Sequence, residues 1–533
     1  MTARILPFGD RGLLAEVDDL AEVLALHARL AATRPDGVVD LVPAARTILV
    51  HVDPTRLGLA AARAWIARAG DAPVAVAAAA PLVELPISYD GADLAALAAH
   101  LGIRPTDLAD RHAACEWTVA FTGFAPGFGY LVCPDWPFDV PRLASPRTRV
   151  PAGAVGLAGA FTGAYPRETP GGWQLIGTTS VPLFDPTADP PALLAPGTRV
   201  RFTPAATPAP APTVMPAITS AREQLAAEST GHTHPLGAPL FSRGSAAALT
   251  VLEPGVLATV QDLGRPGHAA EGVAVSGAAD RAALRTAHRL LGTREDAAGI
   301  EVVMGGFRAV AETDLHVVVT GAWGPIRLAG RAIDPYTVHA WRRGAELHLD
   351  GFTHGARAYV AIRGGLGSAP VVGSRSTDTL SGLGPAPLRA GDTLARADTA
   401  VATPIPPDDL HPWSPPGDAV LEIALAPGPR QDWVTDAADL YAREWTVSAA
   451  ADRVGIRLDG QPLERARHDE LPSEGMLPGA IQVPPDGRPV ILGPDGPVTG
   501  GYPVVAVIAD AARDLLAQAR PGTRIRFRHA RPA

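Results

Sequence analysis

Hydrophobic positions in the first 85 residues repeat with two different periods. Apolar runs such as "RILPFGDRGLLAEV" (4–17) and "RTILVHV" (46–52) are typical of strands. In contrast, "DLAEVLALHARLAA" (19–32) and "TRLGLAAARAWIARAG" (55–70) place apolar residues at helical spacing. The order of these patterns predicts a small α+β domain of βαββαβ type over residues 1–85.

The pattern then changes to short apolar segments separated by Gly and Pro. Residues 86–204 carry one helical pattern, "DLAALAAHLG" (93–102), followed by many such short segments. Short apolar segments separated by Gly and Pro are typical of a β-barrel or a β-sandwich, and the barrel is the prediction for these residues. Residues 205–248 are rich in Pro and Ala and have little to bury, which predicts a linker.

A second β-rich unit is predicted over residues 249–533. It has helical patterns only at 280–292 and 504–519, and a Pro-rich break near 402–417 divides it. Most of its remaining length is again short apolar runs with Gly and Pro between them. The fold class predicted for the whole chain is therefore mainly β with an added α+β part.

Three sequence blocks of the first β-rich unit recur in the same order in the second. They are "VPAGAVGLAG", "TGAYP" and "LAPGTRVRF" at 150–202, and "LPGAIQVPPDG", "TGGYP" and "ARPGTRIRF" at 477–527. An ordered match of this kind indicates two paralogous modules. It also predicts that TGxYP and PGTRxRF mark equivalent turns and closing strands.

Composition narrows the classes of protein. The net charge is −9 and no basic stripe is present, which argues against a nucleic-acid partner. The start of the chain lacks a secretory pattern, and no apolar run approaches the ~20 residues of a membrane span. With only Cys115 and Cys133, the sequence predicts a cytoplasmic protein away from membranes.

The chain contains no lysine and no asparagine, so all 46 of its Lys and Arg residues are arginine. This excludes a P-loop lysine, a Schiff-base lysine and a Ser–Lys catalytic pair. It also contains no HExxH, CxxC or GxSxG motif, and we expect no metal centre.

Candidate binding residues in the first module lie in Gly/Pro clusters, where glycine lets the backbone approach a ligand. Arginine there could donate paired hydrogen bonds to a small polar or anionic substrate. The alternative is that the aromatic residues only plug the corners of a barrel. The candidates for substrate binding are His112, Tyr130, Arg142, Arg147, Tyr165 and Trp173.

The second module gathers carboxylates and arginines in similar clusters, which suits acid–base chemistry on a held intermediate. Turn-capping or surface charges are the alternative for each residue taken singly. The catalytic candidates are Asp262, Asp280, Glu301 and Glu474, and the binding candidates are Arg265, Arg375, Gln482 and Tyr502.

The ordered blocks also resemble known families. "GFAPGFGYL", "PRTRVPAGAVGLAG", "TPGGWQLIG" and "PGTRVRF" resemble the allophanate hydrolase subunit 1 family. "VLEPGVLATVQDLGRPG", "GVAVSGAAD", "GSRST", "DRVGIRLDG" and "EGMLPGAIQVPPDGRPV" resemble the subunit 2 family. These families include the Kip inhibitor and antagonist, the B and C components of 5-oxoprolinase, and relatives in urea carboxylase. The resemblance implies two cyclophilin-like β-barrel modules, the first preceded by the small βαββαβ domain.

This resemblance implies a fused B and C component of an ATP-dependent 5-oxoprolinase, which opens 5-oxo-L-proline to L-glutamate. ATP with Mg would act in the assembled complex, and a LamB/YcsF-type A subunit would be the partner. A carboxyltransferase component of a biotin-dependent urea or amide carboxylase stays open, with no biotin on this lysine-free chain. A Kip-like regulator of a histidine kinase also stays open, as does a homo-oligomer.

Overall fold

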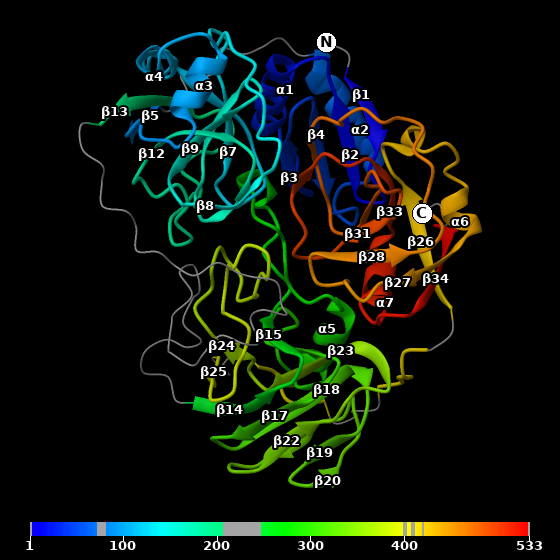
Figure 1. Ribbon diagram of the computed structural model, residues 1–533. Coiled ribbons are helices and arrows are strands. Elements are labelled where there is room, and N and C mark those ends of the chain that lie inside the picture. The colour runs from blue at the N-terminus through cyan, green and yellow to red at the C-terminus, as the bar shows by residue number, and fades with distance from the viewer. Residues whose placement is uncertain are drawn as a thin grey trace.

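The computed structural model describes residues 3–71, 82–205, 247–397, 402–406, 411–417 and 420–530. The described residues form four units, which Figure 1 shows in blue, cyan, green and orange to red along the chain. The predicted linker, apart from its ends, and parts of the predicted break near 402–417 lie outside the described residues. The mainly β fold with two barrel modules is confirmed.

The N-terminal unit, here called the sheet domain, is an antiparallel sheet of order β1-β2-β4-β3 with two helices. Its order is ββαββα, so the predicted βαββαβ order is wrong. Gly9, at φ 75°, turns the chain between β1 and β2, and the expected first strand is a hairpin. The elements are β1 Arg4–Pro7, β2 Gly12–Glu16, α1 Leu20–Ala32, β3 Val38–Pro43, β4 Thr47–Val52 and α2 Leu59–Asp71.

The first barrel, residues 82–204, is a seven-stranded sheet of order β12-β9-β10-β7-β6-β13-β5. Its edge strands meet at one bridge, Ser88 to Thr178, which nearly closes it. Two helices precede β6, where the sequence predicted one. The elements are β5 Leu82–Ile87, α3 Leu94–His100, α4 Pro105–Ala114, β6 Trp117–Thr122, β7 Gly129–Val132, β8 Arg147–Val150, β9 Ala154–Ala158, β10 Phe161–Ala164, β11 Thr169–Gly171, β12 Gln174–Thr178 and β13 Arg199–Pro204.

The third unit, residues 247–396, is a sandwich of a seven-stranded and a five-stranded sheet around one apolar core. Helix α5 packs on β18 and β23 of the smaller sheet. The elements are β14 Ala247–Pro254, β15 Leu257–Gln261, η2 Ala269–Glu271, α5 Arg281–Leu290, β16 Gly299–Val303, β17 Phe307–Ala311, β18 Leu315–Trp323, β19 Ile326–Leu328, β20 Arg331–Ala332, β21 His339–Trp341, β22 Glu346–Leu349, β23 His354–Ile362, β24 Leu366–Gly367 and β25 Thr393–Arg396.

The second barrel, residues 421–529, is closed, with strand order β26-β33-β30-β31-β28-β27-β34. Its first strand lies parallel to its last, as β5 does to β13 in the first barrel. The elements are β26 Leu421–Pro427, η4 Gln431–Trp433, α6 Asp439–Ala442, β27 Glu444–Val447, β28 Gly455–Asp459, β29 Glu474–Gly475, β30 Ala480–Gln482, β31 Val490–Leu492, β32 Thr499–Gly500, β33 Val504–Ile508, η5 Asp510–Ala512, α7 Arg513–Leu516 and β34 Arg524–His529.

The two barrels share one topology, strand for strand. The PGTRxRF blocks are equivalent, because Gly197 and Gly522 turn the chain at φ 88° and 87° into the closing strands β13 and β34. The TGxYP blocks are not equivalent, and that prediction is wrong. TGAYP begins on β10, whereas TGGYP begins on β32, whose counterpart by pairing is β11 in "TPGGW".

The helical pattern predicted over 504–519 is also corrected. Its first five residues, Val504–Ile508, form strand β33, which lies between β26 and β30 in the second barrel, and all five are buried. A continuous apolar run fits a buried strand or a buried helix equally well, so periodicity alone could not decide.

The sheet domain packs on the second barrel and also contacts the first barrel through β3 and β6. Phe8, Leu14 and Leu49 form one apolar cluster with Leu477 and Val507, and the two units lie side by side in Figure 1. No helix in the described part of the chain is both long and apolar enough to cross a membrane.

Candidate functional site

Aromatic side chains gather on one face of the first barrel. Phe128, Tyr130, Phe161, Tyr165 and Trp173 belong to a single buried cluster, here called the aromatic cluster. The ring centroids of Tyr130 and Trp173 are 5.5 Å apart, and those of Phe128 and Tyr165 are 5.0 Å apart. The structure therefore brings together three of the predicted binding residues, Tyr130, Tyr165 and Trp173.

Glycine in "TPGGW" makes room for this cluster. A Cβ atom added at Gly171 would lie 2.5 Å from the hydroxyl oxygen of Tyr165, so no larger residue fits without a shift. Burial raises the pKa of Tyr130 and of Tyr165 to about 12, and the positive charge of Arg142 opposes the shift in both. Both phenols therefore stay protonated at neutral pH, and exposed Arg142 lies within electrostatic range of them.

Arg147 is fixed by the start of helix α3. Its Nη2 donates to Asp93 Oδ1 at 2.6 Å, and the other oxygen of Asp93 accepts from Leu175 N at 2.7 Å. Arg147 also reaches the carbonyl of Trp173 at 3.4 Å. The residue borders the aromatic cluster, and its guanidinium already has a carboxylate partner.

His112 lies apart from the aromatic cluster, in the interior of the barrel. Its ring nitrogens contact Tyr89 Oη at 2.8 Å and Thr162 Oγ1 at 2.9 Å. Burial lowers the pKa of His112 to about 3, so the ring is neutral at physiological pH. Its surroundings are those of a core residue.

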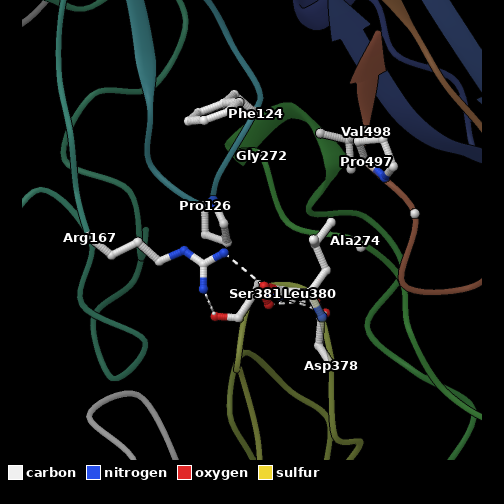
Figure 2. Close-up of a pocket in the computed structure, with 11 residues that line it drawn as sticks. Phe124, Pro126, Arg167, Gly272, Ala274, Asp378, Leu380, Ser381, Pro497 and Val498 are labelled. Carbon is white, nitrogen blue, oxygen red and sulfur yellow. Dashed lines mark hydrogen bonds between the residues drawn. The ribbon is translucent and has the colours of Figure 1, made fainter. Parts of the chain in front are cut away.

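A recess lies where the first barrel, the sandwich and the second barrel meet (Figure 2). Its cavity volume is about 20 Å³, which is room for about one water molecule. Its lining residues come from all three units, and they are Phe124, Pro126, Arg167, Gly272, Ala274, Asp378, Leu380, Ser381, Gly496, Pro497 and Val498.

Phe124 connects the recess with the aromatic cluster. Its ring packs edge to face on Phe128 at 5.5 Å and on Tyr165 at 6.3 Å, and the residue is 43% exposed. Its φ of 67° is in the left-handed region, which bulky residues rarely adopt. Strain of this kind is concentrated at ligand sites, which marks Phe124 as a functional candidate.

The neighbouring Gly123 touches the second barrel. A Cβ atom at Gly123 would lie 1.9 Å from Thr499 Oγ1, so glycine is required for this close approach. Thr499 begins the TGGYP block, whose Tyr502 is 47% exposed. The two Gly-rich motifs, remote in sequence, therefore meet in space beside the recess.

Arg167 joins the first barrel to the sandwich at the recess. Its Nη1 donates to the carbonyl of Ser381 at 2.6 Å, and its Nη2 donates to that of Leu380 at 2.8 Å (Figure 2). Asp378 organises the same turn, because its Oδ1 accepts from Leu380 N and Ser381 N, both at 2.9 Å. Burial raises the pKa of Asp378, and the nearby Asp495 raises it further.

Glu301 lies in a buried polar network between the sandwich and the second barrel. It accepts from Arg453 Nη1 and from Tyr359 Oη, both at 2.7 Å. Burial alone would raise the pKa of Glu301, but Arg453 and Arg357 outweigh it and lower the value. The carboxylate is thus held ionised within the seam and does not line the recess.

Asp280 and Asp262 hold backbone segments. Asp280 caps helix α5 by accepting from Ala283 N at 2.9 Å, and burial raises its pKa to about 6. Asp262 accepts from the hydroxyls of Ser374 and Ser376, both at 2.6 Å. The structure buries both carboxylates, which the sequence had offered as catalytic candidates.

Two arginines of the sandwich have different surroundings. Arg265 is buried and donates from Nη2 to the carbonyl of Ser376 at 2.5 Å, and its Nε and Nη1 have no protein partner among the described residues. Burial lowers the pKa of Arg265, and Asp378 is the charge that most opposes this. Arg375 donates to the carbonyl of Ser368 at 2.8 Å.

Two other predicted residues lie in the second barrel near the sheet domain. Glu474 accepts from Arg430 Nε at 3.0 Å, and the same arginine reaches Glu16 of the sheet domain at 2.7 Å. Gln482 is buried with its amide nitrogen 3.4 Å from Met476 Sδ. Both belong to the packing of these units, away from the recess.

Sequence reasoning missed Phe124, Arg167 and Asp378. Phe124 lies inside the block "GFAPGFGYL", Arg167 directly follows "TGAYP", and Asp378 directly follows "GSRST". Their position in Gly-rich blocks was a usable signal. The described residues contain no group of three His, Cys, Asp or Glu side chains that could hold a metal ion.

The fold and the recess define a class of protein. Two paralogous barrels, one preceded by a small sheet domain and the other by a sandwich, share a recess at their junction. The family model for carboxyltransferase domain subdomains C and D matches residues 3–194, and that for subdomains A and B matches residues 271–529. The chain belongs to this carboxyltransferase-domain family.

Curated relatives match each half separately. The C component of 5-oxoprolinase from Escherichia coli K12 is 35% identical over 288 residues, which cover 52% of this chain and 90% of that protein. The B component of 5-oxoprolinase from Escherichia coli O157:H7 is 51% identical over 125 residues, covering 23% of this chain and 57% of that protein. Urea amidolyase of Lachancea kluyveri is 30% identical over 308 residues, covering 52% of this chain and 17% of that protein.

A solved structure matches nearly the whole chain. The crystal structure of TTHA0988 superposes with a TM-score of 0.83 at 34% identity, covering 97% of this chain and 99% of that one. The arrangement of both halves in one polypeptide is therefore shared with a known structure.

Proposed function

We propose that this chain is the fused B and C component of an ATP-dependent 5-oxoprolinase, which opens 5-oxo-L-proline to L-glutamate together with a separate A subunit. The reaction cleaves the C–N bond of a cyclic amide. The similarity of one half to the B component of 5-oxoprolinase and of the other half to its C component supports this proposal.

One structural observation carries the proposal. The recess takes Phe124, Pro126 and Arg167 from the B-like half and the remaining eight lining residues from the C-like half. A site built by both halves gives a physical reason why both are needed for one reaction. In this proposal the lactam binds beside Phe124 and the aromatic cluster, which exclude water from one side of the ring.

Three helix N-termini do not suit a nucleotide phosphate. Helix N-termini bind phosphate through free backbone N–H groups, but the N-cap residues of α1, α3 and α5 are Asp19, Asp93 and Asp280. These carboxylates would repel phosphate. ATP and Mg²⁺ are therefore assigned to the assembled complex, and no step on this chain is derived through them.

The small size of the recess agrees with the need for a partner. With a cavity volume of about 20 Å³, it cannot hold a five-membered lactam until the surrounding loops move. Docking of a LamB/YcsF-type A subunit would supply the free energy for this opening.

The test is reconstitution. We expect the purified chain to release no glutamate from 5-oxo-L-proline with ATP, and to release it once an A subunit is added. Reactions without ATP and with the A subunit alone are the controls. Glutamate release by the chain alone, or no turnover with any A subunit that binds it, would contradict the proposal.

A carboxyltransferase role is the second candidate, and the match to both carboxyltransferase family models favours it. The carrier would have to come from another chain, because this sequence has no lysine to carry biotin. Transfer of a carboxyl group from biotinylated carrier to urea or a related amide, measured with labelled bicarbonate, decides between the two.

A further inference from the structure

Three segments of the C-like half line the recess, and they are here called the wall segments (Figure 2). The first two, residues 272–274 and 378–381, belong to the sandwich, and the third, residues 496–498, belongs to the second barrel. None of the three lies in a helix or a strand. Their positions are therefore not set by a backbone ladder, and side chains have to hold them together.

Asp495 contacts or adjoins all three wall segments. Its Oδ2 accepts from Thr379 N at 3.0 Å and from Thr379 Oγ1 at 2.7 Å, which holds the second segment. Its Oδ1 accepts from Ser276 Oγ at 2.7 Å, two residues beyond the end of the first segment. The third segment follows Asp495 directly in the sequence. One carboxylate therefore joins the two sandwich segments to the barrel segment.

Arg453 neutralises Asp495 inside the protein, where both side chains are buried. Its Nε donates to Asp495 Oδ2 at 2.8 Å, and its Nη2 donates to Oδ1 at 2.9 Å. Further bonds of 2.7 Å run from Nη1 to Glu301 Oε1 and from Nη2 to the carbonyl of Gly277. Burial alone would raise the pKa of Asp495, but Arg453 outweighs it and lowers the value. Asp495 is thus ionised at neutral pH and accepts all of its hydrogen bonds as a carboxylate.

Stability alone is a weak explanation for this ion pair. A buried ion pair is often no more stabilising than apolar side chains of the same volume, because both charges lose their hydration. What the pair supplies is direction, since the hydrogen bonds of Asp495 end on two wall segments. Neither Arg453 nor Asp495 lines the recess itself.

We propose that Asp495 is a positioning residue that holds the three wall segments of the recess in register, and that Arg453 keeps it ionised in this role. The proposal deepens the proposed function and rests on it, because the recess is there the site of the lactam. Asp495 acts through the walls and does not touch the substrate.

Hydrogen exchange of the full chain tests the positioning without any reaction. In Asp495→Asn the wall segments should exchange at least about 10-fold faster at a temperature where the variant is folded, because charge-assisted hydrogen bonds are lost. Asp514→Asn is the matched control. Asp514 is also a carboxylate of the second barrel that accepts from the sandwich, from Arg281 N and Nε at 2.9 Å, but it does not line the recess or contact its walls.

Two milder variants separate the segments. Thr379→Val removes one hydroxyl donor to Asp495 and should speed exchange mainly in the second wall segment, by about 3- to 10-fold. Ser276→Ala should do the same mainly for the first wall segment. Melting temperatures show whether Asp495→Asn folds, and if it does not, these two hydroxyl variants decide.

Turnover of the complex reconstituted with an A subunit tests whether the positioning serves the reaction. We expect Asp495→Asn to raise the KM for 5-oxo-L-proline at least about 5-fold as well as to lower kcat, because misplaced walls weaken both binding and orientation. A smaller folded fraction would lower the apparent kcat alone. The rise in KM therefore separates misplaced walls from lost protein, and Asp514→Asn should leave both values unchanged.

The positioning role is overturned if exchange of the wall segments is unchanged in Asp495→Asn and in both hydroxyl variants, or if exchange rises equally throughout the chain. An unchanged KM in an active variant whose wall segments exchange faster would also overturn it. If the wild-type complex releases no glutamate, the 5-oxoprolinase function fails instead, and the exchange rates still decide whether Asp495 holds the walls.

Discussion

Trp117 and Trp445 occupy the same position in the two barrels and make the same hydrogen bond. Each indole is fully buried and donates from Nε1 to the carbonyl five residues earlier, Trp117 to His112 and Trp445 to Leu440, both at 3.1 Å. Each tryptophan lies in the shared sequence EWTV, at the start of the strand that pairs with the closing strand of its barrel. The pair shows that the modules share side-chain packing as well as topology.

Trp117→Phe and Trp445→Phe should therefore destabilise their barrels to a similar degree, by about 3 kcal/mol each, through a smaller ring and a buried carbonyl without its donor. Urea unfolding measures the loss, and hydrogen exchange locates it in residues 82–204 or 421–529. If either substitution leaves the free energy of unfolding unchanged, the two indoles have different roles.

Asp40 predicts a pH dependence of stability. It accepts from Gly267 N at 3.0 Å and Ala269 N at 3.2 Å, and burial raises its pKa to about 6, against the nearby charges of Arg34 and His268. The folded state therefore binds more protons than the unfolded state between about pH 4 and 6, and stability falls as pH rises through this window.

The free energy of unfolding of the wild type minus that of Asp40→Asn should fall by about 2 kcal/mol from pH 4 to pH 6. Asparagine cannot ionise and gives up one amide hydrogen bond, which adds only a constant offset. Chemical unfolding at half-unit pH steps measures the curve, and a flat difference would contradict the raised pKa.

Phe124→Gly should lower turnover of the reconstituted complex at least about 10-fold without loss of stability, because glycine relieves the left-handed strain while the ring is lost from the recess. Ala329→Gly is the matched control, since Ala329 has φ 50° in a remote hairpin of the sandwich. Full turnover in both variants would show that Phe124 has no role in the site.

The two halves should assemble without the connecting segment. Arg430 pairs with Glu16, Arg11 with Asp510, and Arg167 holds the 380–381 turn, so the seam contains several charged contacts and an apolar cluster. We expect residues 1–205 and 247–533, co-expressed as separate chains, to co-purify as a 1:1 complex. Elution of separate halves would show that the tether is essential.

The sequence alone determined the local features of this protein. Gly/Pro punctuation of short apolar runs predicted the mainly β fold, the repeated blocks predicted two related barrels, and PGTRxRF marked their equivalent closing strands. Tyr165 and Trp173, two binding candidates close together in sequence, lie together in the aromatic cluster. Strand periodicity and turn residues are local features of the sequence, and repeated blocks are found by comparing the sequence with itself. All three can therefore be read without a structure.

The tertiary structure decided the rest. The strand at 504–508, the different places of the two TGxYP blocks and the burial of Asp262, Asp280 and Glu301 all depend on pairing and packing partners. The recess depends on them most. Arg167 reaches Ser381 across 214 positions of sequence, and no local pattern records which distant loop will accept a hydrogen bond, because that choice is made by the packing of whole units against one another.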